Sequence, residues 1–176
     1  AAPSVPQIGC FDTGFHHTMP WTQSAFALPP RFHDEGLRRY GFHGLSYTSV
    51  ARRLKAQYPE LHAGRVIVAH LGNGASMCAM KGGESLATTM GFSTLDGLAM
   101  GTRCGQIDPG AILHLVRVSG LDHDALEQLL YREGGLLGLS GVSADMRDVE
   151  AAGTEASERA IAYFVARAQR EIGGLT

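Results

Sequence analysis

Three short segments carry polar residues in patterns that suit the binding of cations or anions. Asp12 lies at the end of a possible short strand over residues 5–11 and precedes Thr13 and Gly14, a position that suits an acidic ligand of a hard cation. The same position also suits a turn residue that caps its own backbone. His43 lies between glycines just before an expected helix, where it can donate a hydrogen bond to a developing negative charge. A histidine that only satisfies loop carbonyls is the alternative.

Arg103 lies in the glycine-flanked run GTRCG, residues 101–105. Arginine is the side chain that best matches carboxylate and phosphoryl oxygens, so this position favours anion binding. The turn at residues 72–74, Gly-Asn-Gly, fits either an ordinary hairpin or a turn whose backbone N–H groups receive a phosphate. The charged run 145–148 fits a solvated helix start or a turn.

Periodicity predicts the elements that must position these residues. Apolar runs separated by glycine turns predict an antiparallel meander of strands over residues 66–71, 75–80 and 84–89. The first of these runs is continuously apolar, which is typical of a strand buried on both faces. A further short strand is expected over residues 5–11. The pattern therefore predicts an α+β or α/β unit with a mixed sheet.

Helices are expected over residues 46–58, 108–119, 122–133 and 155–172, with a glycine-rich loop over 91–107. Ser46 is expected to cap the first helix, and Asp108 with Pro109 to begin the second. The side chains expected to face the core are Tyr47, Val50, Ala51, Leu54, Tyr58, Ile112, Leu113, Val116, Ala125, Leu126, Leu129, Leu130, Ile161, Phe164, Val165, Ala168 and Ile172.

Composition excludes several classes of protein. The formal net charge is −2 and no basic block occurs, which argues against a nucleic-acid binder. No apolar run approaches the roughly 20 residues that span a bilayer. The three cysteines are widely spaced, a pattern that indicates neither a disulfide framework nor a zinc site and fits a reducing cytoplasm. We therefore expect a cytoplasmic protein that binds neither nucleic acid nor membrane.

Taken together, five ordered motifs resemble those of the acetokinase family, within the actin-like ATPase superfamily. The motifs are FDTGFHHTMP (11–20), RYGFHG (39–44), HLGNG (70–74), MGTRCG (100–105) with Asp108-Pro109, and GGLLGLS (134–140) followed by DMRD (145–148). The resemblance runs over essentially the whole chain. It implies α/β architecture of the RNase H-like, actin-like kind, incomplete here. Residues 1–20 would hold the last strand and loop of a first domain, and residues 21–176 the beginning of a second.

The resemblance implies ATP-dependent, reversible phosphorylation of acetate to acetyl phosphate by direct in-line transfer with Mg²⁺. Such a transfer needs positioning and charge compensation more than covalent chemistry. Asp12, His43 and Arg103 would be catalytic, and Asp12 would also bind the metal. Phe42 and Thr94 would line the acetate pocket. The nucleotide would be bound by His70, Gly72, Asn73, Gly74, Asp145, Met146 and Arg147.

The sequence also departs from the family pattern. Family members are more than twice as long, so we expect a piece of a longer enzyme that is inactive alone. Tyr47 stands where many members have a second histidine, and Thr94 where many have a proline that walls the acetate pocket. Propionate or another short-chain acyl group is therefore an alternative substrate. A non-catalytic dimerisation fragment is another alternative, because family members tend to form homodimers through the second domain.

Overall fold

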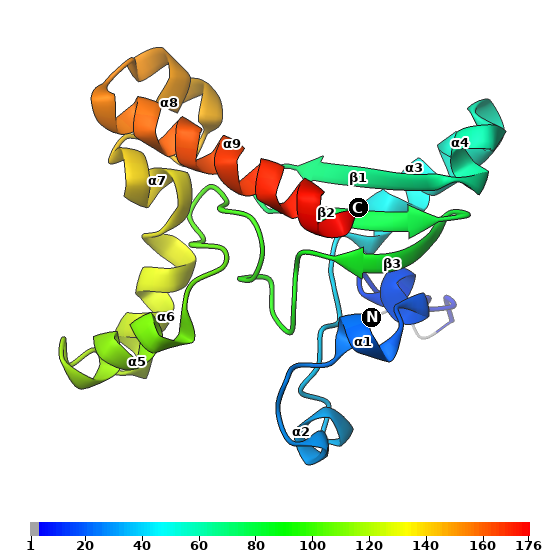
Figure 1. Ribbon diagram of the computed structural model, residues 1–176, viewed down its shortest axis with the longest axis horizontal. Coiled ribbons are helices and arrows are strands. Elements are labelled where there is room, and N and C mark those ends of the chain that lie inside the picture. The colour runs from blue at the N-terminus through cyan, green and yellow to red at the C-terminus, as the bar shows by residue number, and fades with distance from the viewer. Residues whose placement is uncertain (1–3) are drawn as a thin grey trace.

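The computed structural model describes residues 4–176, which form a small sheet flanked by helices (Figure 1). The elements in chain order are the 3₁₀ helix η1 (Gly14–Thr18), α1 (Trp21–Ser24), α2 (Pro30–Asp34), α3 (Gly44–Gln57), α4 (Pro59–Ala63), β1 (Arg65–Leu71), β2 (Ala75–Lys81), β3 (Glu84–Thr88), α5 (Pro109–Arg117), α6 (His123–Arg132), α7 (Gly135–Ser140), α8 (Met146–Ala152) and α9 (Glu155–Leu175). Within residues 4–176, every helix is too short or too polar to cross a membrane.

The three strands form the antiparallel meander that the sequence predicts, in the order β1-β2-β3. Leu71 pairs with Ala75 across the Gly-Asn-Gly turn, and Lys81 pairs with Glu84 across the second turn. A register shift at Ala79 and Met80 introduces an irregularity between β2 and β3. The predicted α/β class and the three strands are confirmed, with strand ends that agree to within one residue.

The central strand β2 is buried on both faces. Because side chains alternate along a strand, Ala75 and Met77 lie on one face and Cys78 and Met80 on the other. The long helix α9 covers the first face, and α3 covers the second through Tyr47 and its neighbours. Figure 1 shows α9 running from the α7–α8 region across to the sheet. This three-layer arrangement holds the residues at the start of β2 in a rigid frame.

The prediction that β1 is buried on both faces is wrong. None of its residues is fully buried: Val66, Ile67, Val68 and His70 are half-buried and the other three are exposed, because β1 lies at the edge of the sheet and pairs only with β2 among the described residues. An apolar run of this length is common to central and edge strands, so composition alone does not distinguish them.

The predicted strand over residues 5–11 is also wrong. These residues are irregular and exposed, and Ile8 and Phe11 keep 85% and 78% of their surface accessible. A strand needs a hydrogen-bonded partner, and no described strand pairs with this segment. Directly after it, η1 packs on β3 and buries His16. The division of the chain at residue 20 stays a prediction.

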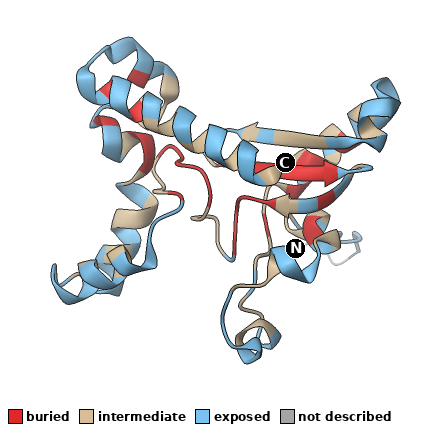
Figure 2. Cartoon of the chain, in the orientation of Figure 1, coloured by how far each residue is buried: buried red, intermediate tan, exposed pale blue. Residues whose placement is uncertain are grey.

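The predicted helices are confirmed in existence but not in every boundary or buried face. The first begins at Gly44 and ends at Gln57, and Ser46 does not cap it. The segment 146–152 forms a helix, as one of its two interpretations proposed. Figure 2 shows α5 and α6 as largely exposed. The residues predicted to be buried that are exposed are Tyr58, Leu113, Val116, Ala125, Val165 and Ile172.

Candidate active site

Asp12 caps the N-terminus of α3, although 31 residues separate it from the first capped N–H group. Its carboxylate accepts hydrogen bonds from the backbone N–H groups of His43 at 2.6 Å and Leu45 at 3.4 Å. The backbone carbonyl of Asp12 also accepts from Gly44 at 2.9 Å. The first N–H groups of a helix lack partners within the helix, and a carboxylate there is further stabilised by the helix dipole.

Gly44 permits this close approach. A Cβ atom built on Gly44 would lie 2.1 Å from the carbonyl oxygen of Asp12. Any side chain at this position would therefore push the Asp12 segment away from the helix. The glycine that follows His43 is required by packing, and it fixes Asp12 beside the site.

His43 is held by three contacts. Its backbone is left-handed, with φ of +61°, and no other non-glycine residue among the described ones has a positive φ. Its N–H group donates to Asp12, and its Nδ1 lies 2.8 Å from the hydroxyl of Ser76. Its ring stacks on the ring of His70, with centroids 4.0 Å apart and planes 18° apart. These contacts leave only Nε2 free to meet a ligand.

Burial lowers the pKa of His43, and the neighbouring His70 lowers it further. The charge of Asp12 opposes this shift, whereas that of Arg103 adds to it. A neutral imidazole is therefore favoured at neutral pH. A neutral ring can donate one hydrogen bond without adding a full charge.

Arg103 is held by its loop rather than by a carboxylate. Its Nη1 donates to the carbonyl oxygen of Thr94 at 3.3 Å and lies 3.6 Å from the sulfur of Met100. Within residues 4–176, no carboxylate lies within 4 Å of the guanidinium group. A guanidinium that keeps most of its donors unused is suited to an anionic ligand.

His43 and Arg103 converge on Gly74, at the end of the turn between β1 and β2. A Cβ atom built on Gly74 would lie 3.2 Å from Nε2 of His43 and 3.4 Å from Nη1 of Arg103. The glycine therefore leaves a space onto which an imidazole and a guanidinium both point. An imidazole and a guanidinium that border the same space can both contact the oxygens of one anionic group.

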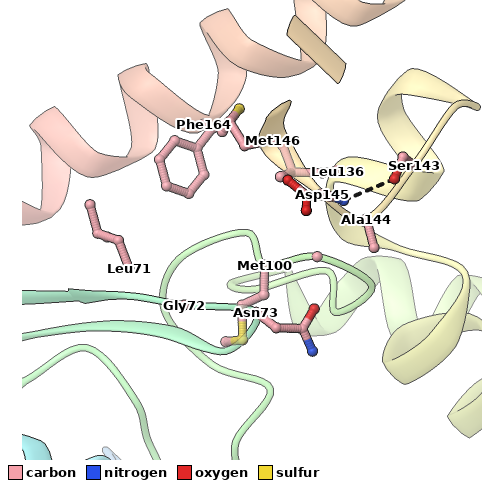
Figure 3. Close-up of a pocket in the computed structure, with 11 residues that line it drawn as sticks. Leu71, Gly72, Asn73, Met100, Leu136, Ser143, Ala144, Asp145, Met146 and Phe164 are labelled. Atoms are coloured by element: carbon pink, nitrogen blue, oxygen red, sulfur yellow. Dashed lines mark hydrogen bonds between the residues drawn. The ribbon is translucent and has the colours of Figure 1, made fainter. Parts of the chain in front are cut away.

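A pocket of about 570 Å³ is lined in part by Gly72 and Asn73 of the same turn. It is lined by Leu71, Gly72, Asn73, Met100, Gly101, Leu136, Ser143, Ala144, Asp145, Met146 and Phe164. In Figure 3, Leu71 and Phe164 lie on one side of the pocket, and Ser143 and Ala144 on the other. Backbone bonds join its walls, since Gly101 donates to the carbonyl of Asn73 at 3.1 Å. Pockets of this size and largely apolar lining hold ligands of drug-like dimensions.

Asp145 caps α8 at the rim of this pocket. Its carboxylate accepts bonds from the backbone and guanidinium of Arg147, and these bonds lower the pKa of Asp145 to about 2. Arg147 itself is 87% exposed in its side chain and does not line the pocket. The two residues therefore form a charged pair at the opening of the pocket.

The structure gathers most of the predicted site residues in two adjacent places. His43 and Arg103 border the space at Gly74. Asp12 bonds to the backbone of His43, His70 stacks on its ring, and the carbonyl of Thr94 accepts from Arg103. Gly72, Asn73, Asp145 and Met146 line the pocket, whereas Phe42 packs against the core between α9 and the sheet. The pocket residues that sequence reasoning missed are Leu71, Met100, Gly101, Leu136, Ser143, Ala144 and Phe164; Phe164 was expected only as a core residue.

Asp12 is the one predicted metal ligand. Among residues 4–176, no group of three or more His, Cys, Asp or Glu side chains is placed to hold a metal ion. Each carboxylate oxygen of Asp12 accepts a backbone bond and keeps a further lone pair. Mg²⁺ commonly binds through one or two carboxylates together with substrate phosphates and water, so this single carboxylate fits that cation.

Comparisons with known proteins agree over nearly the whole chain. The model of the acetokinase family matches residues 1–176. An acetate kinase of Methylocella silvestris is 59% identical over 99% of this chain and 43% of its own length. The crystal structure of an acetate kinase from Porphyromonas gingivalis matches with a TM-score of 0.92 and 38% identity, over 98% of this chain and 45% of that one.

A propionate kinase from Francisella tularensis matches equally well in fold. Its crystal structure gives a TM-score of 0.92 at 37% identity and covers 98% of this chain and 46% of that one. The chain thus spans less than half the length of these relatives. These neighbours have the actin-like ATPase fold that the motifs predict.

Proposed function

The chain belongs to the acetokinase family, and from this membership we propose that the protein containing it transfers a phosphoryl group from ATP to acetate. The product is acetyl phosphate, and the reaction is reversible. Since the chain covers under half of its relatives, the activity is proposed for the longer protein and not for these 176 residues.

The observation that carries the proposal is the convergence of His43 and Arg103 on the space at Gly74, next to the pocket. A transferring phosphoryl group spreads negative charge over three oxygens and needs donors already in place to receive it. An imidazole and a guanidinium supply such donors. The imidazole is held by Asp12, Ser76 and His70, and the guanidinium by its own loop. The adjacent pocket at Gly72 and Asn73 is placed to receive the nucleotide that delivers the group.

The residues of the site divide the work as follows. Arg103 binds the acetate carboxylate and the equatorial phosphoryl oxygens, and Nε2 of His43 donates to the same oxygens. Asp12 is the residue that would hold Mg²⁺, which when bound neutralises charge on the phosphates. Asp12 also holds the backbone of His43, so the same carboxylate positions the imidazole.

The nucleotide is proposed to lie in the pocket of about 570 Å³. Its phosphates are received at the turn formed by Gly72, Asn73 and Gly74, and His70 at the start of this turn also belongs to the nucleotide site. The adenosine contacts Asp145, Met146 and Arg147. The apolar wall at Leu71 and Phe164 offers surface against which a planar base can pack.

Propionate is the second candidate substrate. The propionate kinase from Francisella tularensis matches the fold as well as an acetate kinase does, with a TM-score of 0.92 in both cases. Phe42 and Thr94 are proposed to set the size of the acyl pocket. Thr94 lacks the ring constraint that a proline would impose on this wall.

The family resemblance supports three further parts of the proposal. Residues 1–20 belong to the end of a first actin-like domain, and residues 21–176 to the beginning of a second. The whole protein is a cytoplasmic homodimer that associates through the second domain. A fragment that only dimerises is the non-catalytic alternative.

The test is an assay of the full-length protein for acetyl phosphate, trapped as the hydroxamate, with ATP, Mg²⁺ and either acetate or propionate. Arg103→Ala is expected to lower kcat by roughly 100-fold or more, the effect of removing one preorganised donor to a developing charge. Arg117→Ala, on the exposed face of α5, is the matched control and should retain full activity. Absence of acyl phosphate in the wild type would reject the proposed activity.

A further inference from the structure

A buried chain of hydroxyl groups reaches His43 from the side opposite its ligand-facing nitrogen. The phenol oxygen of Tyr47 lies 2.5 Å from Oγ of Ser76, and the same Oγ lies 2.8 Å from Nδ1 of His43. Tyr47 comes from α3 and Ser76 from β2, and both have 0% of their surface exposed. Neither hydroxyl is therefore in contact with bulk solvent.

Each of the two hydroxyl groups has one proton to donate, and this determines which group donates in each of the two hydrogen bonds. Within residues 4–176, the only hydrogen-bond partner of the Tyr47 hydroxyl is Ser76. A buried phenol O–H without an acceptor is costly, so Tyr47 must donate to Ser76. Ser76 has one proton, and its remaining partner is Nδ1 of His43. The serine therefore donates to Nδ1, which must carry a lone pair.

We propose that Tyr47 and Ser76 fix His43 in the tautomer that carries its proton on Nε2. With Nδ1 accepting from Ser76, the single proton of the neutral ring resides on the nitrogen that faces Gly74 and Arg103. The opposite tautomer would place an N–H group against Ser76. Three protons would then share two hydrogen-bond contacts, so one buried hydroxyl proton, that of Ser76 or that of Tyr47, would be left without an acceptor.

The pKa of Tyr47 and the orientation of the His43 ring support hydrogen bonds that run from Tyr47 through Ser76 to His43. Burial raises the pKa of Tyr47, so the phenol keeps the proton that begins the chain. A flip of the His43 ring by 180° about χ2 would preserve the stacking on His70, but it would remove Nδ1 from Oγ of Ser76, so the Ser76 contact favours the present orientation of the ring. Tyr47 and Ser76 are thus positioning residues that act through His43.

The consequence for chemistry rests on the proposed phosphoryl transfer. A donor at Nε2 can bind a phosphoryl oxygen, whereas a lone pair there would repel it. In Tyr47→Phe, the freed serine can either donate to Nδ1 or accept from it, so both tautomers become available. We expect kcat to fall roughly 2- to 10-fold, the ratio that one neutral hydrogen bond is worth, with KM for both substrates unchanged.

The direct test is nitrogen NMR of the full-length protein with ¹⁵N-labelled histidine at pH 8, where the imidazole is neutral. Signals of His43 are identified by their loss in His43→Gln. The wild type is expected to show a protonated Nε2 and a bare Nδ1. In Tyr47→Phe and in Ser76→Ala, the two nitrogen shifts should move toward each other as the tautomers mix.

Matched controls separate this role from general destabilisation. Ser157→Ala removes another buried serine hydroxyl, and Tyr58→Phe removes an exposed phenol, and neither should move the His43 signals. A wild-type spectrum with protonated Nδ1, or unchanged shifts in both folded variants, overturns the proposal. Loss of the proposed activity is a separate result, since the assay for acyl phosphate reports on function and the spectrum reports on the tautomer.

Discussion

The carboxylate of Asp12 accepts the backbone N–H of His43 at 2.6 Å and thereby joins two motifs that are 31 residues apart. This bond gives Asp12 two roles that different variants can separate. One is to cap α3, and the other is to offer charge to a cation. An asparagine keeps a capping oxygen but loses the charge, whereas an alanine loses both.

Asp12→Asn is expected to change the free energy of unfolding by less than about 0.5 kcal/mol relative to the wild type, because aspartate and asparagine cap helices almost equally well. It should nevertheless slow turnover and raise the Mg²⁺ concentration required for half-maximal activity in the full-length protein. Asp12→Ala should lower the free energy of unfolding by about 1 kcal/mol in addition. A magnesium titration and a thermal melt of each variant measure the two effects.

The matched control is Asp122→Ala. Asp122 caps the exposed helix α6 through the N–H of Ala125 at 2.9 Å, so its loss removes a cap of the same kind far from the site. It should cost a similar amount of stability without changing the magnesium requirement. A magnesium dependence that is identical in wild type and Asp12→Asn rejects the metal-binding role.

Gly74→Ala tests the space between His43 and Arg103. Gly74 does not have a left-handed backbone, so alanine introduces contact rather than strain. Its methyl group would lie 3.2 Å from Nε2 and 3.4 Å from Nη1, and these donors would have to move by a few tenths of an ångström. We expect kcat to fall about 10-fold or more, because small displacements of catalytic groups are costly.

Gly173→Ala is the control for that substitution, since a Cβ at Gly173 meets no atom within 4 Å. Alanine within α9 should raise stability by about 0.5–1 kcal/mol and leave kcat unchanged. Steady-state kinetics and melting temperatures of both variants provide the comparison. Full activity in Gly74→Ala would show that the two donors do not act on a group at this place.

His16 predicts a dependence of stability on pH. Its ring is buried, with Nδ1 2.8 Å from Oγ of Ser85 and Nε2 2.9 Å from the carbonyl of Phe42. Burial lowers the pKa of His16 in the folded protein, although the Phe42 carbonyl and the charge of Asp12 oppose the shift. As the pH falls below about 6.5, His16 therefore becomes protonated in the unfolded chain while it stays neutral in the folded chain.

The contribution of His16 to the free energy of unfolding should consequently be fully present above about pH 6.5 and should be lost as the pH falls below it. His16→Gln should be less stable than the wild type at pH 8, but its melting temperature should fall less steeply between pH 8 and pH 5. His17→Gln changes an exposed neighbour and should keep the wild-type slope. A His16→Gln slope equal to that of the wild type contradicts the assignment.

The sequence predicted the parts of this structure that depend on local patterns. Apolar runs broken by Asn-Gly and Gly-Gly turns identify the three strands because strand pairing across tight turns is local. Asp108 before Pro109 identifies the start of α5, and its carboxylate accepts from the N–H of Gly110.

Features that depend on distant partners were not predictable in this way. Ser46 was expected to cap α3, but the cap is Asp12, which no local pattern connects to the helix. Ser46 instead lies 3.0 Å from the ring of His70. Leu113 and Val116 have helical periodicity but remain exposed, because an amphipathic pattern does not say whether a covering surface is present among these residues.

Thr94→Pro tests the acyl selectivity of the site. The carbonyl of Thr94 accepts from Arg103, and its N–H donates no hydrogen bond within residues 4–176, so proline preserves the known contacts while fixing φ. We expect the wild type to use propionate measurably and the variant to favour acetate more strongly. The ratio of kcat/KM for acetate to that for propionate should change by no more than roughly 10- to 200-fold, which is the discrimination that one methylene group can provide.

Thr94→Val is the control, since valine keeps the size and branching of threonine without constraining φ. Its ratio of kcat/KM for acetate to that for propionate should stay near the wild-type ratio. The two ratios are measured side by side in the hydroxamate assay. If the ratio does not change in Thr94→Pro, this residue does not wall the acyl pocket.

The 176 residues alone are expected not to turn over acetate and ATP. They span under half of their relatives, and the described part offers Asp12, His43 and Arg103 but no cluster of metal-binding side chains. Phosphoryl transfer needs compensating charge around the whole transferring group, and closure around it to exclude water. We propose that the remaining charge and the closure come from parts of the full-length protein outside these 176 residues.

The same piece should still bind nucleotide weakly, because it contains Asp145, Met146 and Arg147, the residues proposed to contact the adenosine. It should also self-associate, since β1 presents a seven-residue edge that no described strand covers. Calorimetry with ADP, sedimentation and the hydroxamate assay measure these three properties, with the full-length protein as control. Turnover within tenfold of that control would place the complete catalytic machinery in these residues and refute the expectation that they are inactive alone.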